Sequence, residues 1–212
     1  MNNAERIRNE KLGASLIKAL ALRHFDAYYC ASSSEAAEKI LSLIPKTDVV
    51  SWGGSMTMEA LGVIDCVKKG GWRVIDRSTA QSQEEKIEIT RSALLCDTYL
   101  TGANAISEDG EIVNVDGIGN RVAAMTFGPK SVIVACGINK VVKTAQDALS
   151  RARNTAAPVN AQRFDIRTPC KTTGTCADCK STDSICSYIV RTRLCKPAGR
   201  IKVVLIGEAL GF

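Results

Sequence analysis

The chain has 212 residues, of which 45% are hydrophobic and 24% charged, as in a globular protein with a core of its own. It contains no run of the roughly 20 apolar residues that a membrane-spanning helix needs. The charged, amphipathic start of the sequence also lacks the apolar core of a secretory signal. We therefore expect a cytoplasmic protein with no membrane contact.

The net charge of +6 is distributed unevenly along the chain. Residues 1–119 carry a balance of −4, whereas residues 120–212 carry +10. The second half should therefore attract anions. Aromatic residues make up only 5% of the chain, and no basic strand has the interleaved aromatic residues of a single-strand-binding protein. We expect a small anionic metabolite or an acidic protein as the partner, and no nucleic acid.

Helices and strands are predicted to alternate along the chain. Residues 3–24 show helical spacing, and Leu12, Leu16 and Leu20 lie on one face of that helix. Ser34 is a candidate N-cap for the next helix. Further helices are predicted over residues 35–43, 56–69, 78–92 and 141–157, with strands within 25–32, 47–55, 72–76, 96–106, 131–139 and 200–212. This alternation predicts an α/β fold with a mostly parallel sheet flanked by helices.

A glycine-rich turn follows the second predicted strand, in the sequence "VVSWGGSMTMEALG". Gly53 and Gly54 would allow a ligand to approach the backbone, and the hydroxyls of Ser55 and Thr57 could donate to phosphate or carboxylate oxygens. The alternative is a tight turn in which Ser55 only caps the next helix. The turn matches neither the dinucleotide fingerprint nor the P-loop.

A second stretch, "TGANAISEDGEIVNVDGIGNRVAA" over residues 101–124, combines two turns with many small polar side chains. The turn at residues 108–110 separates two short strands, and "DGIGN" forms the second turn before a short helix. Small polar residues at strand ends are typical of a ligand cleft. The alternative is a crossover whose side chains cap its own backbone.

Four cysteines, Cys170, Cys176, Cys179 and Cys186, lie within seventeen positions and have the spacing C-x5-C-x2-C-x6-C. In a reducing compartment, such a cluster more often ligates metal than forms disulfides. The compact spacing favours an iron–sulfur cluster, with [4Fe–4S] as the first choice and structural zinc as the second. Metal-free thiols or disulfides remain the third interpretation.

The other five cysteines receive simpler interpretations. Cys30, Cys66, Cys96 and Cys136 occur in apolar segments, so we expect them to lie in the core. Cys195 is either a spare ligand or a bystander. The single histidine, His24, lies at the end of the first helix, and we expect it to be a surface or capping group rather than a catalytic base.

The motifs "SWGGSMTMEALG" and "GANAISEDGEIVNVDGIGNRVAA", in this order, resemble the LUD domain family over roughly residues 10–206. That family is associated with bacterial lactate utilisation. It is similar in turn to the large superfamily of glucosamine-6-phosphate deaminase, ribose-5-phosphate isomerase and the CoA transferases. The resemblance implies one LUD-type domain over residues 1–212, with a cysteine-rich insertion at 168–196 before the last strand.

The resemblance also implies a set of ligand-binding residues. The first loop of the superfamily holds an anion, and the substrate-facing loops match the "GAN" and "DGIGN" segments. The implied ligand-binding residues are Gly53, Gly54, Ser55, Thr57, Gly102, Asn104, Gly117, Gly119 and Asn120. Sugar-phosphate isomerases of this type often carry an acid where this chain has Asn104, and an amide cannot act as a general base. Asp116 is therefore the candidate catalytic carboxylate.

Together these features predict an accessory protein of lactate or related organic-acid oxidation that binds a small anion and an iron–sulfur cluster. The resemblance implies an iron–sulfur or flavin oxidoreductase subunit as a partner, and we also expect a homo-oligomer. The alternatives are an enzyme acting on a sugar phosphate or acyl-CoA with structural zinc, and a non-catalytic metabolite-binding regulator. Whether the protein is an enzyme at all is left open by the sequence.

Overall fold

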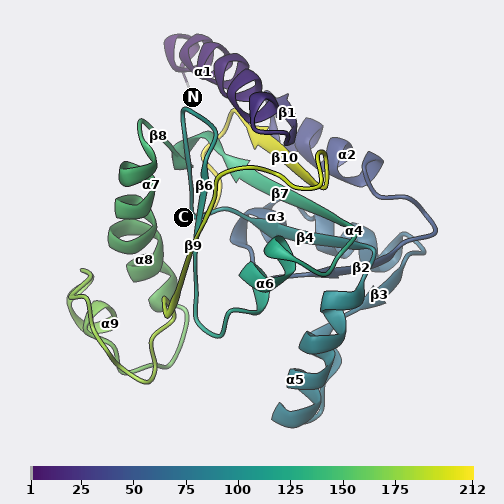
Figure 1. Ribbon diagram of the computed structural model, residues 1–212, viewed down its shortest axis with the longest axis vertical. Coiled ribbons are helices and arrows are strands. Elements are labelled where there is room, and N and C mark those ends of the chain that lie inside the picture. The colour runs from purple at the N-terminus through teal and green to yellow at the C-terminus, as the bar shows by residue number, and fades with distance from the viewer. Residues whose placement is uncertain (1) are drawn as a thin grey trace.

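A six-stranded parallel sheet forms the centre of the computed structural model, which describes residues 2–212 (Figure 1). The strand order is β1-β10-β7-β4-β2-β3, and every neighbouring pair is parallel. The strands are β1 (Asp26–Cys30), β2 (Val49–Trp52), β3 (Arg73–Ile75), β4 (Thr98–Gly102), β7 (Ser131–Gly137) and β10 (Ile201–Ile206). The predicted α/β fold with a mostly parallel sheet is therefore confirmed.

Helices cover both faces of this sheet. They are α1 (Asn3–Leu22), α2 (Ser33–Ser42), α3 (Met56–Ala60), α4 (Val63–Lys69) and α6 (Asn120–Thr126). The connections also contain the 3₁₀ turns η1 (Arg77–Thr79), η2 (Ala93–Leu95) and η3 (Ile138–Lys140), and α5 (Gln83–Ser92), which projects away from the sheet. Alternate residues of β7 point to opposite faces: Val132 and Val134 pack in the core beneath α1 and α6, and Ile133 in the core beneath α2 and α4. Burial on both faces explains why the central strands are continuous apolar runs.

A second, four-stranded sheet lies beside the first, in the order β8-β5-β6-β9. It consists of β5 (Ala105–Ser107), β6 (Ile112–Asp116), β8 (Val141–Val142) and β9 (Tyr188–Thr192). It packs against a helical column, seen at the left of Figure 1, made of α7 (Ala145–Arg151), the π-helical turn η4 (Ala152–Ala156) and α8 (Ala157–Ala161). The last helix, α9 (Pro169–Thr173), lies at the lower end of this column.

Several predicted helix boundaries are wrong. The helix predicted over residues 78–92 begins only at Gln83, after the separate 3₁₀ turn η1. The N-cap of α2 is Ser32 rather than Ser34, because the Ser32 side chain accepts the backbone N–H of Glu35. The helix predicted over residues 56–69 is two helices, separated at Gly62, whose φ of 66° no helical residue adopts. The helix predicted to end before Pro158 begins at Ala145 and continues to residue 161, because the π-helical turn accommodates a residue that lacks a backbone N–H.

The cysteine-rich segment is more ordered than a simple loop. It contains α9 at its start and β9 at its end, and β9 pairs antiparallel with β6. The segment at 168–196 is thus joined to the second sheet through one of its edge strands. Within residues 2–212, no helix is long and apolar enough to cross a membrane.

Candidate functional site

A cavity of about 350 Å³ opens where three parallel strands end. Gly54 and Ser55 follow β2, Gly102 ends β4, and Lys140 follows β7. Because parallel strands place their carboxyl ends at the same edge of a sheet, residues distant in sequence meet here. We refer to it as the glycine-lined cavity. Its lining also includes Arg77, Ala103, Asn104, Asp116, Gly117, Ile118, Asn120, Arg121, Ala157, Asn160, Arg163, Ile185 and Phe212.

Most residues predicted to bind a ligand lie in the wall of this cavity. They are Gly54, Ser55, Gly102, Asn104, Gly117 and Asn120, together with the candidate catalytic residue Asp116. A side chain at Gly102 is excluded by close packing, because an added Cβ would lie 2.8 Å from the Ser55 hydroxyl oxygen. The two sequence motifs therefore meet at one site, although about 50 residues separate them.

The remaining three predicted ligand-binding residues lie outside the lining. Gly53 is beneath the Arg121 side chain, where an added Cβ would lie 3.0 Å from Cδ. Thr57 is fully buried and contacts Lys140. Gly119 precedes α6 with φ 83° and lines a neighbouring cavity. The structure thus gives Gly53 and Thr57 supporting positions rather than direct exposure to the cavity.

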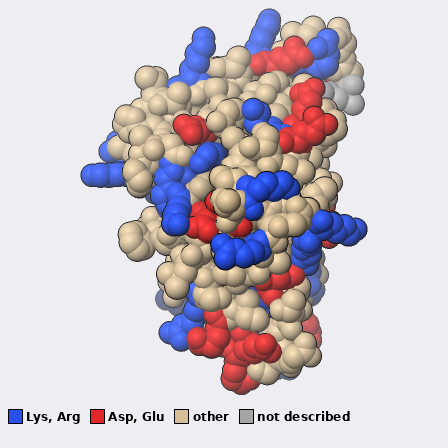
Figure 2. Space-filling view, turned by 90° about the vertical axis from the view of Figure 1, so that its right-hand side faces the viewer, with Lys and Arg blue, Asp and Glu red and all other residues tan. Residues whose placement is uncertain are grey.

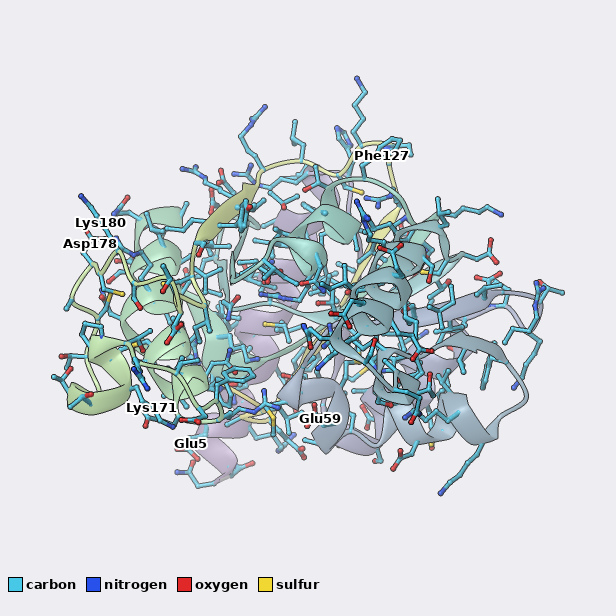
Figure 3. The ribbon with its side chains drawn as sticks, turned by 90° about the horizontal axis from the view of Figure 1, so that it is seen from below. Glu5, Glu59, Phe127, Lys171, Asp178 and Lys180 are labelled. Atoms are coloured by element: carbon cyan, nitrogen blue, oxygen red, sulfur yellow. The ribbon has the colours of Figure 1, made fainter. Side chains whose placement is uncertain are left out.

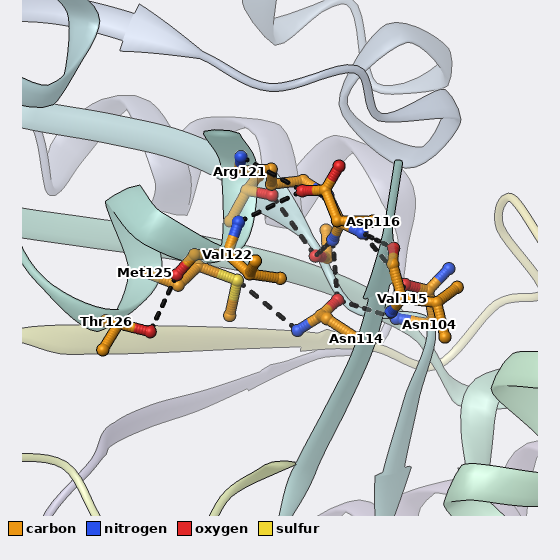
Figure 4. Close-up of polar contacts among 10 residues, drawn as sticks. Asn104, Asn114, Val115, Asp116, Arg121, Val122, Met125 and Thr126 are labelled. Atoms are coloured by element: carbon orange, nitrogen blue, oxygen red, sulfur yellow. Dashed lines mark hydrogen bonds and ion pairs between the residues drawn. The ribbon is translucent and has the colours of Figure 1, made fainter. Parts of the chain in front are cut away.

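Arg121 organises the wall of the glycine-lined cavity (Figure 4). Its Nη1 donates to the Gly102 carbonyl at 3.1 Å and to Asn114 Oδ1 at 2.6 Å. Its Nη2 donates to Asn104 Oδ1 at 3.0 Å and to the Val115 carbonyl at 2.6 Å. This guanidinium joins the end of β4 to the end of β6. Burial lowers the pKa of Arg121, but a guanidinium with so many partners remains charged.

Asp116 has a structural role in the same network. Its Oδ2 accepts the backbone N–H groups of Arg121 at 3.1 Å and Val122 at 3.2 Å, so it caps the start of α6. The same oxygen lies 3.8 Å from Arg121 Nε. Among the residues that line the cavity, Asp116 is the one carboxylate. The catalytic role predicted for it stays a prediction.

Asn104 is held in place by the same wall. Its Oδ1 accepts from Arg121 Nη2 and from the backbone N–H of Val115 at 3.0 Å. The side-chain oxygen is therefore used within the protein. An amide held in this way has neither the charge nor the basicity of the acid found in sugar-phosphate isomerases.

Lys140 is a site residue that the sequence analysis missed. It is only 3% exposed, and its Nζ lies 2.9 Å from Thr57 Oγ1 and 3.3 Å from the Ala103 carbonyl. Burial lowers the pKa of this ammonium, whose two hydrogen-bond acceptors are an uncharged hydroxyl and a backbone carbonyl. A buried lysine beside a ligand cavity is a group from which an anion could accept a hydrogen bond.

The lining carries more positive than negative charge. Four cations, Arg77, Arg121, Lys140 and Arg163, accompany the single carboxylate of Asp116. By contrast, α3 is too short for a strong helix dipole, and the Ser55 side chain is its N-cap, accepting the Met58 backbone N–H at 3.3 Å. The positive potential of the cavity therefore comes from side chains rather than from the glycine-rich turn.

All four cysteines of the predicted metal motif line a second cavity of about 320 Å³. We refer to it as the cysteine cavity. It lies at the end of the molecule where Figure 3 places Lys171, Asp178 and Lys180. Its lining comprises Cys170, Cys176, Cys179, Cys186, Arg153, Ala157, Pro158, Ala177, Asp178, Lys180, Ser181, Ser184, Ser187 and Ile189. All four cysteines are free thiols, and within residues 2–212 no three His, Cys, Asp or Glu side chains converge on a single ion position.

Hydrogen-bond donors surround these sulfurs. Thr168 Oγ1 lies 3.3 Å from Cys170 Sγ, and Ser184 Oγ lies 3.4 Å from Cys186 Sγ, each two residues before its cysteine. Arg153 Nη2 lies 3.8 Å from Cys176 Sγ. The Nε of Arg153 is buried and, among the described residues, is the one buried side-chain nitrogen or oxygen with no hydrogen-bond partner. Arg153 Nη2 also forms an ion pair with Asp178, so the guanidinium beside the sulfurs is paired with a carboxylate but keeps Nε as a buried donor without a partner.

The other cysteines partly follow the prediction. Cys30, Cys96 and Cys136 are buried in the core as expected, and burial raises the pKa of the Cys96 thiol to about 12. The prediction for Cys66 is wrong, because this residue lies on the exposed side of α4. Cys195 is buried away from the cysteine cavity, where its Sγ accepts from the Ile201 backbone N–H, so it is a bystander.

The two cavities adjoin each other. Ala157 lines both, and Ile185, which immediately precedes Cys186, lines the glycine-lined cavity. A Cβ at Gly117 would lie 3.3 Å from Ile185 Cα, so the two loops are in close contact. The pairing of β6 with β9 fixes this arrangement, because Asp116 lies opposite Tyr188. The cysteine-rich segment thus forms one wall of the glycine-lined cavity.

Comparison with solved structures gives a match over nearly the whole chain. A crystal structure of a DUF162 family protein from Deinococcus radiodurans matches with a TM-score of 0.52 and 14% identity, covering 95% of this chain and 97% of that one. Ribose 5 phosphate isomerase A from Neisseria gonorrhoeae matches 53% of this chain and 54% of its own at 15% identity and TM-score 0.35. The eIF2B delta structure from Chaetomium thermophilum matches 63% of this chain and 54% of its own, at 17% identity and the same TM-score. Among curated proteins, no sequence matches.

The family assignment comes from the sequence itself. The family model described as the LUD domain matches residues 14–206, which include both strand-end motifs, the cysteine-rich segment and the last strand. This agrees with the resemblance over roughly residues 10–206 that the two motifs indicated. The chain therefore belongs to the LUD domain family.

Proposed function

We propose that this protein is an accessory of lactate or related organic-acid oxidation, which binds a small organic anion in the glycine-lined cavity and an iron–sulfur cluster in the cysteine cavity. One observation carries the proposal. A cavity lined by four cations shares a wall with a cavity lined by four cysteines. Family membership supports the link to organic-acid metabolism but does not identify the acid.

The anion half of the proposal rests on charge and burial. Lys140 Nζ is held by Thr57 at the edge of the cavity, and Arg121 lies in its wall. The attraction between these cations and a carboxylate is strengthened where water is excluded. Glycines at positions 54, 102 and 117 leave room for a ligand of a few atoms against the backbone.

The cluster half rests on the fit between the cysteine cavity and a polynuclear group. In a zinc site with Zn–S bonds of about 2.3 Å, four sulfurs would lie about 3.8 Å from one another. Here all four cysteines line one cavity of about 320 Å³, which has room for a group larger than a single ion. This room, together with the compact spacing of the four cysteines, is our reason for proposing a cluster before zinc.

The donors around the cysteine cavity fit the same group. A cluster held by four thiolates carries negative charge, and its sulfurs accept hydrogen bonds. The unpartnered Nε of Arg153 and the hydroxyls of Thr168 and Ser184 are donors of the required kind. The candidate ligands are the four predicted cysteines, Cys170, Cys176, Cys179 and Cys186. When bound, such a cluster supplies one-electron transfer.

The shared wall explains why both sites occur in one chain. The contact between Ile185 and Gly117 lies in the wall between the two cavities. An anion bound between Lys140 and Arg121 would lie on one side of this wall, and the four cysteines lie on the other. An iron–sulfur or flavin oxidoreductase subunit is the proposed partner, because a cluster near the end of the molecule can exchange electrons with another protein. The protein then acts as a binding and electron-transfer accessory.

The cluster is tested by anaerobic purification, visible absorption and analysis of iron, acid-labile sulfide and zinc. We expect a brown protein with about four irons per chain for a [4Fe–4S] cluster. The double variant Cys176→Ser, Cys179→Ser should lose both iron and colour, whereas Cys66→Ser, at an exposed position on α4, should keep them. One zinc per chain without colour would refute the cluster and make the segment a structural zinc site.

A further inference from the structure

A third cavity, of about 410 Å³, lies directly beside the glycine-lined cavity. We refer to it as the α5 cavity. Arg77, Ile118 and Asn120 line both, so the two spaces meet at the tip of the "DGIGN" turn. The rest of the α5 cavity is formed by Gln83, Lys86, Ile87, Thr90, Arg91, Leu94, Gly119 and Ala123. Although polar and basic side chains also line it, a larger share of its exposed surface is apolar than in the glycine-lined cavity.

Helix α5 lies outside the core. None of its residues is buried, and it projects from the lower end of the molecule (Figure 1). Its cavity-lining residues are at positions 83, 86, 87, 90 and 91, followed by Leu94 just after the helix. This is the i, i+3, i+4, i+7, i+8 spacing of a single helix face. One complete face of α5 is therefore directed at the cavity.

The charges of α5 are sorted between its two sides. Both of its cations, Lys86 and Arg91, line the cavity, whereas Glu84, Glu85 and Glu88 do not. Acidic side chains also dominate the lower end of the molecule in Figure 2, where α5 lies. With Arg77 at the junction, the cavity-facing side thus carries positive charge, which suits an anionic ligand.

Ile118 provides the apolar surface at the junction. It is 76% exposed, although it lies between two glycines at the entrance of a polar cavity. Ile87, on α5, is 46% exposed and lines the same cavity. Exposed apolar side chains that line one cavity gain stability when an apolar group covers them.

We propose that the α5 cavity is a second subsite for the apolar arm of an organic acid whose anionic head binds in the glycine-lined cavity. The inference rests on the proposed anion site and narrows its ligand class to acids with an apolar chain of several carbons. The head would lie between Lys140 and Arg121, and the arm would pass Ile118 toward Ile87 and Leu94. Lys86 and Arg91 would add long-range attraction for the anion.

The test is isothermal titration calorimetry, in which the full-length protein is titrated with a series of straight-chain carboxylates. Acetate, butyrate, hexanoate and octanoate share one head group and differ only in chain length. We expect the affinity to rise by roughly two- to fourfold for each methylene that is buried in the α5 cavity. Acetate and octanoate should compete for one site.

Two variants locate the effect. Ile87→Ser, on α5, should reduce the ratio of octanoate to acetate affinity by about tenfold, because a small side chain with one hydroxyl would then replace the apolar contact. Phe127→Ser is the matched control. Phe127 is also an exposed apolar residue, at the far end of α6 (Figure 3), but it lies outside the lining, so the ratio should not change.

Each outcome decides between the two proposals. Acetate binding without any gain along the series would overturn the second subsite and leave the anion site standing. No binding of acetate, lactate or phosphate would reject the anion site itself. An equal octanoate preference in wild type and Ile87→Ser would also overturn the inference.

Discussion

Lys140 Nζ donates a hydrogen bond of 2.9 Å to Thr57 Oγ1, although the two residues lie at the ends of different strand connections, 83 positions apart in the sequence. Thr57 is fully buried in α3, and Lys140 follows the central strand β7. The contact fixes a buried ammonium beside the glycine-lined cavity. Thr57, predicted to contact an anion directly, instead accepts this hydrogen bond from Lys140.

Replacing Lys140 with methionine should weaken anion binding by about 10- to 100-fold, the usual loss for one hydrogen bond to a charged group. The measurement is a calorimetric titration with lactate and with the acetate-to-octanoate series. Lys143→Met is the matched control, because Lys143 is exposed and pairs with Glu108 outside the cavity. Equal affinity in wild type and Lys140→Met would remove Lys140 from the site.

The buried ammonium should also make stability depend on pH. Burial lowers the folded-state pKa of Lys140 below its usual value of about 10.5. Between the two pKa values the unfolded chain binds more protons, so the free energy of unfolding should rise with pH in this range. Denaturant unfolding of wild type and Lys140→Met between about pH 7 and 10 measures this dependence. The free energy of unfolding of the wild type should rise relative to that of Lys140→Met as the pH rises.

Arg121→Lys should destabilise the protein by about 2–4 kcal/mol. A lysine cannot reproduce the fork that reaches four oxygens at the ends of β4 and β6, so several buried acceptors would lose their partner. Urea unfolding measures the loss. Arg91→Lys, at an exposed side chain that pairs with Glu88, should change stability by less than about 0.5 kcal/mol.

Arg153→Met should lower the reduction potential of the cluster, because a cation that donates toward the sulfurs stabilises the more negative, reduced form. Arg153→Lys should restore part of the shift. The readout is a potentiometric titration with dithionite followed by visible absorption, and Arg167→Met, an exposed position outside the cysteine cavity, serves as the control. A potential that does not differ between wild type and Arg153→Met would show that the guanidinium does not act on the cluster.

The central strands could be predicted from the sequence because their burial on both faces leaves a continuous apolar run, as in β7 and β10. Strand β9 could not be predicted in this way. Its residues Tyr188 and Ile189 are about half exposed, and the strand has one neighbour, β6, so its sequence carries no clear periodicity. The helix across Pro158 was missed because proline, which lacks a backbone N–H, normally ends a helix. Here a π-helical turn precedes Pro158, and rules based on single residues do not describe such turns.

The candidate site was predictable where glycines and small polar residues gather in one motif. The cations were not, because Lys140, Arg77 and Arg163 are single residues in separate segments that only the parallel sheet and its connections bring together. The "GINK" sequence directly after a buried strand is the one signal that could have identified Lys140. The spacing of the cysteines predicted their common location, but not the wall that they share with the other cavity.

The most direct test of the account is the anion affinity of the anaerobically purified, cluster-loaded protein against that of the Cys176→Ser, Cys179→Ser variant. Ile185 and Gly117 join the cysteine segment to the glycine-lined cavity, so loss of the cluster should loosen this wall and weaken the binding of the tightest-binding carboxylate in the calorimetric series. A clear fall in affinity in the variant is the predicted result. Equal affinities, with iron analysis showing the cluster present in one protein and absent from the other, would contradict the claim that the two cavities work together.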